Sequence, residues 1–486
     1  MNSGQPDLKP VFKLFLLLFS NRWVKQWQRQ HPGPQASCQP KGPPAPGPRQ
    51  PGSRPGFYER IFSLRVTLWF LLFQRLNFDI SLAGVVRSLR NGEADGLCRR
   101  GRKLSQRVKS NSTSAYNQAR QRLPLEFLLG AWAQLSRWIV SLVGCVEQSR
   151  SKPPLAQRVR QLLDGSTLAL LATPALRLAF RPARGQTDWS LMRIVVGFCA
   201  RSGAVLTAVE GAITQSEQRL TWGLMAAAAP FIIWIGDRNF GIWSVVAQAV
   251  RYRQDVVVRM TRARANKLAA GRPLASGEDR AVQWQPSRRD QGAQGTERTA
   301  IAGRLIYVRL ERDQRWIDLW LFTTLSRQEA TVQLLVQWYG QRWQAELHFR
   351  SIKTQMRLGQ LDVCTPEMAR KEFFAALLAY SLVRAVMWAA GQRLESGARP
   401  LSFSDARRVL VDWLENWGRQ VGRSSAGASQ WIKTLLAEVA QQRLPKRKKP
   451  RRSQIRMVRR RASKWPILKG SRAAAEKRLA TNSKSS

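Results

Sequence analysis

Apolar residues recur at every third or fourth position through the N-terminal part of the chain, which is the spacing of amphipathic helices. The pattern predicts helices within residues 57–89, and a further helix over residues 115–122 follows the cap-forming sequence that starts at Asn111. Pro124 starts another helical stretch. Residues 56–160 are therefore expected to form an all-α region.

The pattern changes after residue 160, where short apolar and β-branched runs replace the helical spacing. The predicted order is strand, strand, strand, helix, strand, over residues 162–164, 192–199, 204–208, 220–229 and 231–235. The first strand runs into Asp164, and the last ends just before Asp237. This order predicts a mixed α/β domain in which two strands carry an aspartate.

The pattern changes again in the C-terminal half. Short strand-like runs over 255–260, 305–310 and 316–324 surround a polar, Arg-rich middle and predict a β-rich insertion at residues 251–325. A long helix is expected from Gln328 past Lys353, and another over residues 368–390.

The ends of the chain have a different composition. Residues 32–55 contain nine prolines, and residues 441–486 contain seventeen Lys and Arg against one acidic residue, Glu476. Neither composition can build a packed core. We expect a disordered lead-in and a basic tail.

Charge adds a class of partner to this picture. The chain has 80 Lys and Arg against 31 Asp and Glu, a net charge of +49, which attracts polyanions such as nucleic acids or acidic membrane surfaces. With 44% hydrophobic residues the chain also has enough apolar side chains for a folded core. The helix with Arg120 and Arg122 has two interpretations, a surface that lies against DNA or a solvated basic face.

Composition also excludes several kinds of site. His31 and His348 are the only histidines, which leaves almost nothing for a histidine-based metal site, and no cysteine pair has metal-ligand spacing. The P-loop sequence is absent, so no nucleotide cofactor is expected. The longest apolar run, 224–235, is shorter than the roughly 20 residues of a membrane span. We expect a soluble, intracellular protein with no membrane partner.

Five polar side chains form a stripe on the long predicted helix. At about 100° per residue, with Tyr339 at zero, Arg342, Glu346, Arg350 and Lys353 fall at roughly 300°, 340°, 20° and 320°. Such a stripe suits a phosphate backbone held beside a metal-binding glutamate, and an exposed charged helix face is the alternative. His348 lies on the opposite side of the helix and is expected to be structural.

The spacing of Tyr339, Arg342, Glu346 and Lys353 resembles the Tyr-Arg-Glu-Lys signature of the insertion-sequence-four family of DDE transposases. Asp164-Gly-Ser-Thr resembles the motif of that family's first aspartate, and the sequence Asp-Arg-Asn-Phe at 237–240 resembles that of the second. The resemblance extends over roughly residues 57–390. It implies an RNase H-like catalytic core, a mixed sheet flanked by helices, interrupted by the β-rich insertion and preceded by an all-α DNA-binding region.

This resemblance implies a domain organisation and a catalytic site. The expected parts are a Pro/Gly-rich disordered lead-in (1–55), a helical DNA-binding region (56–160), the first part of the core (161–250), the insertion (251–325), the second part of the core with the glutamate helix (326–395), a C-terminal helical segment (396–440) and the basic tail (441–486). Asp164, Asp237 and Glu346 would be the catalytic and metal-binding residues, holding two Mg²⁺, or Mn²⁺, through hard oxygen ligands.

The resemblance also implies partners. Tyr339, Arg342, Lys353 and Arg350 would bind DNA phosphates, and Trp320 is the candidate for stacking on a flipped base, with a core tryptophan as the alternative. The partners would be double-stranded DNA, both the terminal inverted repeats of a mobile element and its target, and a second copy of the chain on DNA. The expected location is the bacterial cytoplasm, at the nucleoid. The alternatives are a decayed transposase that binds DNA without catalysis and an RNase H-fold nuclease that cuts without joining.

Overall fold

The protein is described from a computed structural model, in which residues 1–444 group as one unit and residues 445–486 as a second. The residues described are 21–31, 61–77, 80–97, 103–146, 149, 151–181, 190–288, 290, 297–312, 315–394, 399–420, 425–446, 471–474 and 476. Most of the expected basic tail and the Pro-rich part of the lead-in lie outside them.

Helices make up the N-terminal part of the first unit, as the apolar spacing predicts. They are α2 (Asn21–Gln30), α3 (Leu64–Leu76), α4 (Leu82–Arg90), α5 (Leu104–Arg107), α6 (Ser114–Arg122) and α7 (Leu125–Leu142), with a 3₁₀ turn η1 at Asp95–Leu97. Helix α2 differs from the expected disordered lead-in. Its Val24 and Trp27 are buried, and Trp27 packs edge-on against Phe127 of α7. Residues 21–30 are therefore helical because their apolar side chains pack against α7.

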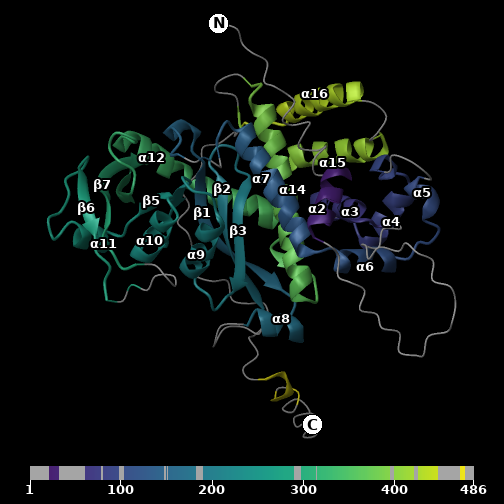
Figure 1. The fold of residues 1–486 in the computed structure, drawn as a ribbon, viewed down its shortest axis with the longest axis horizontal. Helices are drawn as coiled ribbons and strands as arrows, with labels where there is room; N and C mark the ends of the chain where they lie inside the picture. The colour runs from purple at the N-terminus through teal and green to yellow at the C-terminus, as the bar shows by residue number, and fades with distance from the viewer. Residues whose placement is uncertain are drawn as a thin grey trace. The chain divides into compact units, whose positions relative to one another are not determined.

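The first unit contains a nine-stranded sheet (Figure 1). Its strands are β1 (Arg160–Leu170), β2 (Leu191–Cys199), β3 (Val205–Ala212), β4 (Ile233–Gly236), β5 (Asp255–Arg259), β6 (Asp279–Trp284), β7 (Ile301–Arg312), β8 (Arg315–Thr323) and β9 (Gln360–Leu361). The order is β3-β2-β1-β4-β5-β8-β7-β6, with β9 beside the end of β1. Strands β1, β4 and β5 are parallel, and β2 and β3 form the antiparallel hairpin that the sequence predicts.

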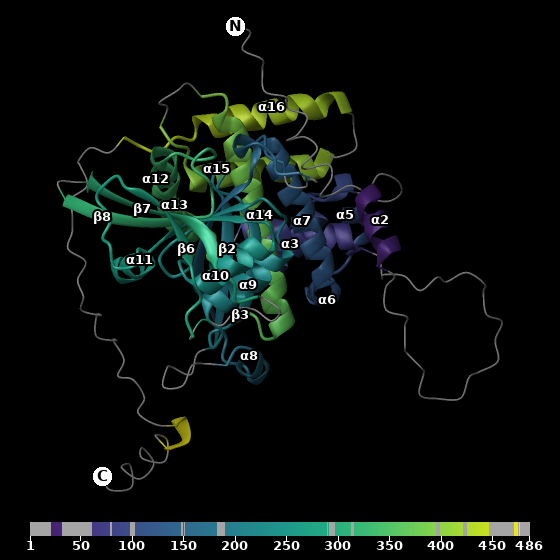
Figure 2. The same ribbon diagram turned by 60° about the vertical axis from the view of Figure 1, so that its left-hand side comes forward.

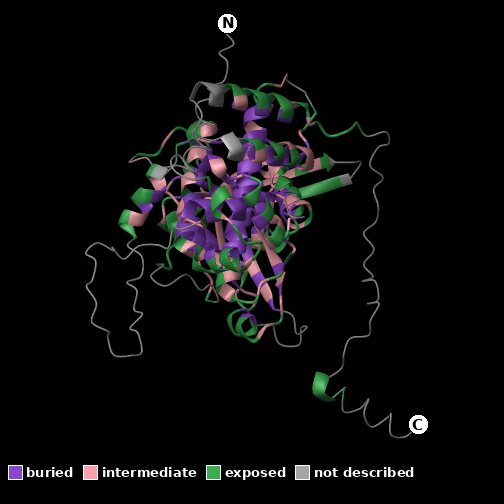
Figure 3. Ribbon diagram, turned by 90° about the vertical axis from the view of Figure 1, so that its right-hand side faces the viewer, coloured by how far each residue is buried: buried purple, intermediate pink, exposed green. Residues whose placement is uncertain are grey.

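Helices cover the part of this sheet that contains β2 and β4. Strand β4 is buried at every residue and β2 almost throughout, as in sheets covered on both faces. The helices and turns of this part are η2 (Leu155–Gln157), α8 (Pro174–Ala179), α9 (Glu217–Ala227), α10 (Trp243–Arg251) and α11 (Arg262–Leu268), followed later by α14 (Pro366–Gly391), α15 (Phe403–Gln420) and α16 (Ser425–Gln441). Figure 3 shows the buried residues concentrated around the sheet and the helices against it. The fold is therefore the expected mixed α/β arrangement.

Helix α14 is the central connector between the sheet and the N-terminal helices. It contacts β3, α3 and α7 (Figure 1). Among the described helices it has the length and apolar composition of a membrane span, but 89% of its most apolar window is buried inside the protein. The apolar side chains of α14 therefore pack inside the protein, as those of a core helix do.

The polar side of the same helix corrects one interpretation of the N-terminal region. Glu372 of α14 is buried and pairs with Arg75, at 3.1 Å, and with Arg120. Arg120 therefore does not belong to the basic face predicted for this helix, whereas Arg122 of the same helix is exposed. It neutralises a buried carboxylate, and this ion pair ties α6 to the core.

The β-rich segment differs from its predicted bounds. Residues 255–259 form β5, which pairs in parallel with β4 and therefore belongs to the central sheet. Its residues Val256–Val258 are buried in the core. The remainder, β6 to β8, continues the same sheet through the antiparallel pairing of β5 with β8. Figure 2 shows β7 and β8 projecting as a long hairpin.

The predicted long helix is divided. It consists of α12 (Val332–Gln341), α13 (Trp343–Arg350) and a π-helical turn, η3 (Ser351–Gln355), and the first division falls at Arg342. Thr331 caps α12 by accepting a hydrogen bond from the backbone N–H of Leu334.

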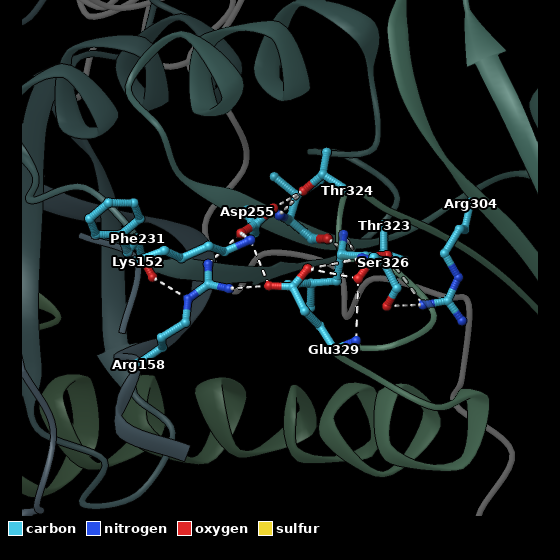
Figure 4. A network of polar contacts seen from close by, with 11 residues as sticks. Lys152, Arg158, Phe231, Asp255, Arg304, Thr323, Thr324, Ser326 and Glu329 are labelled. Carbon is cyan, nitrogen blue, oxygen red and sulfur yellow. Dashed lines mark hydrogen bonds and ion pairs between the residues drawn. The ribbon is translucent and has the colours of Figure 1, made fainter. Parts of the chain in front are cut away.

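A partly buried polar network centred on Arg158 holds the start of this helical segment against the sheet (Figure 4). The Arg158 side chain is fully buried, donates to the carbonyl of Phe231 at 2.9 Å and pairs with Asp255 and Glu329. Lys152 lies 2.6 Å from Glu329 and 3.6 Å from Asp255. The network joins the first residue of β5 to the turn before α12, and so anchors the start of α12 on the sheet.

Candidate active site

The register of two parallel strands places the two aspartates side by side. Leu163 of β1 pairs with Gly236 of β4, so the next residues along the chain are Asp164 and Asp237. Asp164 continues in β1 opposite Val196 of β2, while the chain leaves β4 at Asp237. The carboxyl ends of adjacent parallel strands are where polar side chains can gather at one sheet edge.

Local hydrogen bonds hold both aspartates. Asp164 Oδ1 accepts from the backbone N–H of Gly165 at 2.9 Å, and Asp237 Oδ1 accepts from the backbone N–H of Asn239 at 2.8 Å. Each contact fixes one carboxylate oxygen and leaves the other for a further partner.

Glu346 joins the two aspartates from the helical layer. It lies in the first turn of α13, which contacts β1, and its Oε1 accepts from Arg342 at 2.8 Å. The same guanidinium lies 3.9 Å from Asp164 Oδ2. Arg342 therefore bridges a strand carboxylate and a helix carboxylate, which places Asp164 and Glu346 on two sides of one cation.

The electrostatics of Asp164 reflect this crowding. Burial raises its pKa from 3.8 to about 6, while the Gly165 N–H and Arg342 lower the pKa, and the charges of Asp237 and Glu346 raise it. The carboxylates at this edge therefore repel one another, and a cation between them is favourable.

The other residues of the predicted stripe lie at different depths. Tyr339 is largely buried, and burial raises its pKa, while Arg342 and Arg259 lower it. Lys353 is half-buried in η3, where burial lowers its pKa. Arg350 is exposed. Arg350 is thus the exposed member of the stripe, and the stripe residues on either side of it are partly buried.

The tryptophan predicted in the insertion is half-buried on the β7–β8 hairpin. Trp320 stacks on Tyr307 with ring centroids 5.0 Å apart and planes at 13°. Its carbonyl accepts from Met260, just beyond the end of β5, so it lies toward the sheet edge of Asp237. Trp316 on the same hairpin is 61% exposed, whereas Trp284 is buried against Phe322.

His348 is buried, as its helix position predicts. Its ring lies among Phe198 and Tyr380, and burial, with the nearby Arg384, lowers its pKa well below 6.5. A neutral imidazole packed between aromatic rings has a structural role.

The chemistry of the site suits a hard divalent cation, because its donors are carboxylate oxygens. The Arg342 guanidinium lies between Asp164 and Glu346 and offsets part of their negative charge. Within the described part of the chain, however, no three His, Cys, Asp or Glu residues lie close enough together to hold a metal.

A fourth carboxylate at this edge was missed in the sequence. Glu217 begins α9, and its Oε2 accepts from the side chain of Asn239 at 2.7 Å. The sequence signal was the cap-forming Ser216 followed by an acidic first turn, which indicates a helix start but no site.

Part of the chain matches a known protein family. Residues 157–382, which include Asp164, Asp237 and Glu346, match the family model described as "Transposase DDE domain". No curated protein matches the chain. A solved structure titled "Cryo-EM structure of piggyBac transposase synaptic complex with hairpin DNA (SNHP)" is 10% identical, over 91% of this chain and 87% of that one. The TM-score between the two structures is 0.37. The family match supports a DDE transposase.

Proposed function

We propose that this protein cuts DNA at the ends of a mobile element and joins those ends to target DNA, with Asp164, Asp237 and Glu346 as the catalytic carboxylates. The observation that carries the proposal is the β1–β4 register, which makes Asp164 and Asp237 neighbours, together with the Arg342 bridge to Glu346. All three carboxylates lie in the segment that matches the transposase model.

We further assign the fold to the RNase H-like class and the signature to the insertion-sequence-four family. The strand order β3-β2-β1-β4-β5, with β1, β4 and β5 parallel and β2 antiparallel, supports the fold assignment. The position of Tyr339, Arg342, Glu346 and Lys353 along one helical segment supports the signature.

Asp164, Asp237 and Glu346 are the residues that would hold two Mg²⁺ or Mn²⁺. When bound, such ions supply an activated water or DNA hydroxyl and stabilise the leaving oxygen at phosphorus. The protein's part is to present oxygen donors on a rigid sheet edge and to orient the phosphate. Arg342, once released from the carboxylates, has the fork geometry for a phosphate, and Lys353 offers a point charge.

We propose that the hairpin and the helical stripe face the same DNA. Trp320 has a flat partner in Tyr307, and a base added to that stack would be held without sequence preference. Tyr339 and Arg350 would extend the phosphate contacts along the helix. The active form would be a dimer on double-stranded DNA in the bacterial cytoplasm.

The test measures metal-dependent cleavage and joining separately. Asp237→Asn and Glu346→Gln should each lower Mg²⁺-dependent nicking of element-end DNA at least a hundredfold, while DNA binding survives. Wild-type cleavage in either variant would refute the assignment. Binding without any nicking by the wild-type chain would indicate a decayed transposase, and nicking without strand transfer would indicate a nuclease.

A further inference from the structure

We infer that Glu217 is a positioning residue of this active site, which fixes the spacing of Asp164 and Asp237 by joining the two segments that carry them. The inference rests on the proposed function and adds a residue outside the three carboxylates. Glu217 lies at the start of α9, on neither β1 nor the loop after β4.

The first link runs from Glu217 to the Asp237 loop. Its Oε2 accepts from Asn239 Nδ2 at 2.7 Å, and the backbone N–H of the same asparagine donates to Asp237 Oδ1 at 2.8 Å. Gln218 adds a second clamp from α9 by donating to Asn239 Oδ1 at 2.5 Å and to its carbonyl at 3.2 Å. Asn239 is thus held on one side by α9 while it orients the aspartate on the other.

The second link runs from Glu217 to the Asp164 strand. A methyl group added at Gly165 would lie within 2.6 Å of both carboxylate oxygens of Glu217. The Glu217 carboxylate therefore lies directly against Gly165, and a methyl group at that position would displace it. Through these two contacts α9 determines how far apart the two aspartate-bearing segments lie.

The charges around Glu217 are consistent with a position beside the catalytic carboxylates. Burial raises its pKa, Arg193 lowers the pKa, and the charge of Asp237 raises it. Arg193 of β2 offsets the added negative charge, so the protein can hold a fourth carboxylate near the other three.

Removing a carboxylate that positions metal ligands should weaken the binding of the metal ion and leave the overall fold unchanged. Loss of a residue that orients ligands typically costs about 10–100-fold in metal affinity. Mg²⁺ demands near-ideal octahedral geometry, so displaced aspartates should harm its binding more than that of Mn²⁺.

The test uses the full-length chain with Mn²⁺ alone and in a nicking assay. Glu217→Ala should raise the Kd for Mn²⁺ about tenfold, as measured by electron paramagnetic resonance of the free ion. The same variant should raise the half-saturating Mg²⁺ concentration for nicking by a larger factor. Glu217→Gln, whose amide oxygen can still accept from Asn239, should restore most of both. Glu126→Gln, in the first turn of α7, is the matched control.

Gly165→Ala tests the same residue without altering it. The new methyl should push the Glu217 carboxylate away from Asn239, so this variant should bind Mn²⁺ as weakly as Glu217→Ala. The double variant should be no weaker than either single one. Additive losses in the double variant, or wild-type Mn²⁺ affinity in Glu217→Ala, would overturn the inference.

The outcomes separate this inference from the proposed function. If the wild-type chain nicks no DNA with either ion, the proposed reaction is wrong, and the Mn²⁺ arm still decides the role of Glu217. If the wild-type chain nicks and the variants match it at every ion concentration, the reaction stands and the positioning role is wrong.

Discussion

Replacing Asp164 by asparagine should stabilise the protein while it abolishes cleavage. The Asp164 side chain is only 17% exposed, and its pKa rises from 3.8 to about 6 on folding, with burial as the largest cause. The folded state therefore binds this proton more tightly than the unfolded state. Stability falls as the pH rises from about 4 to about 6, and the cost persists at higher pH.

The magnitude follows from the shift. One pKa unit corresponds to about 1.4 kcal/mol, so an ionised Asp164 costs roughly 3 kcal/mol of unfolding free energy at pH 8. Asparagine mimics the protonated acid and avoids this cost. The gap between Asp164→Asn and wild type should shrink to about 0.5 kcal/mol at pH 4, where the wild-type carboxyl is protonated in the folded state.

Urea denaturation of both proteins at pH 4, 5, 6 and 8 measures this gap from the midpoints and slopes. Asp362→Asn, at an exposed aspartate after β9, serves as the control and should show no comparable gap. A variant at Asp164 that is no more stable than wild type at pH 8, or a gap independent of pH, would refute the reasoning. A variant that is more stable but inactive would mean that the ionised carboxylate needed for activity lowers the stability of the protein.

Three further outcomes follow from other contacts. Glu372→Gln should cost about 3–5 kcal/mol in urea denaturation because it leaves its two arginine partners without a buried counter-charge, whereas Asp405→Asn at an exposed ion pair should cost less than about 1 kcal/mol. Arg342→Gln should shift the pH midpoint of nicking upward, because this cation lowers the pKa of Asp164. Trp320→Ala should slow nicking about tenfold with little loss of DNA affinity, and the signal of 2-aminopurine at the cut site should report the lost stack.

The strands that carry the aspartates were predictable because their apolar runs are short and bounded by turns. The runs before Asp164 and Asp237 become β1 and β4, and the turn at Gly203 becomes the β2–β3 connection. The β1–β4 register was beyond a single sequence, because a long stretch of chain separates the strands. Before the structure, only the family resemblance linked these aspartates.

Side-chain partners distant in sequence account for the errors. Arg120 has the pattern of a basic surface helix, but Glu372, its partner, lies 252 residues away. Residues 255–259 have the pattern of an insertion strand, but their buried valines pair with β4 in the core. Glu217 has the pattern of a helix start, and only its contact with Asn239 gives it a place in the site.

Not all of the basic residues are available to bind DNA. Several arginines are buried and donate to carbonyls or carboxylates inside the fold, among them Arg158, Arg304 and Arg407. A guanidinium there serves as a fixed fork of donors and offers nothing to a phosphate. By contrast, Arg342 is held by the very carboxylates that a metal would take. Under the proposed function, a divalent ion that displaces Arg342 would neutralise the carboxylates and release this cation for the DNA, so its position would matter more than the total charge of +49.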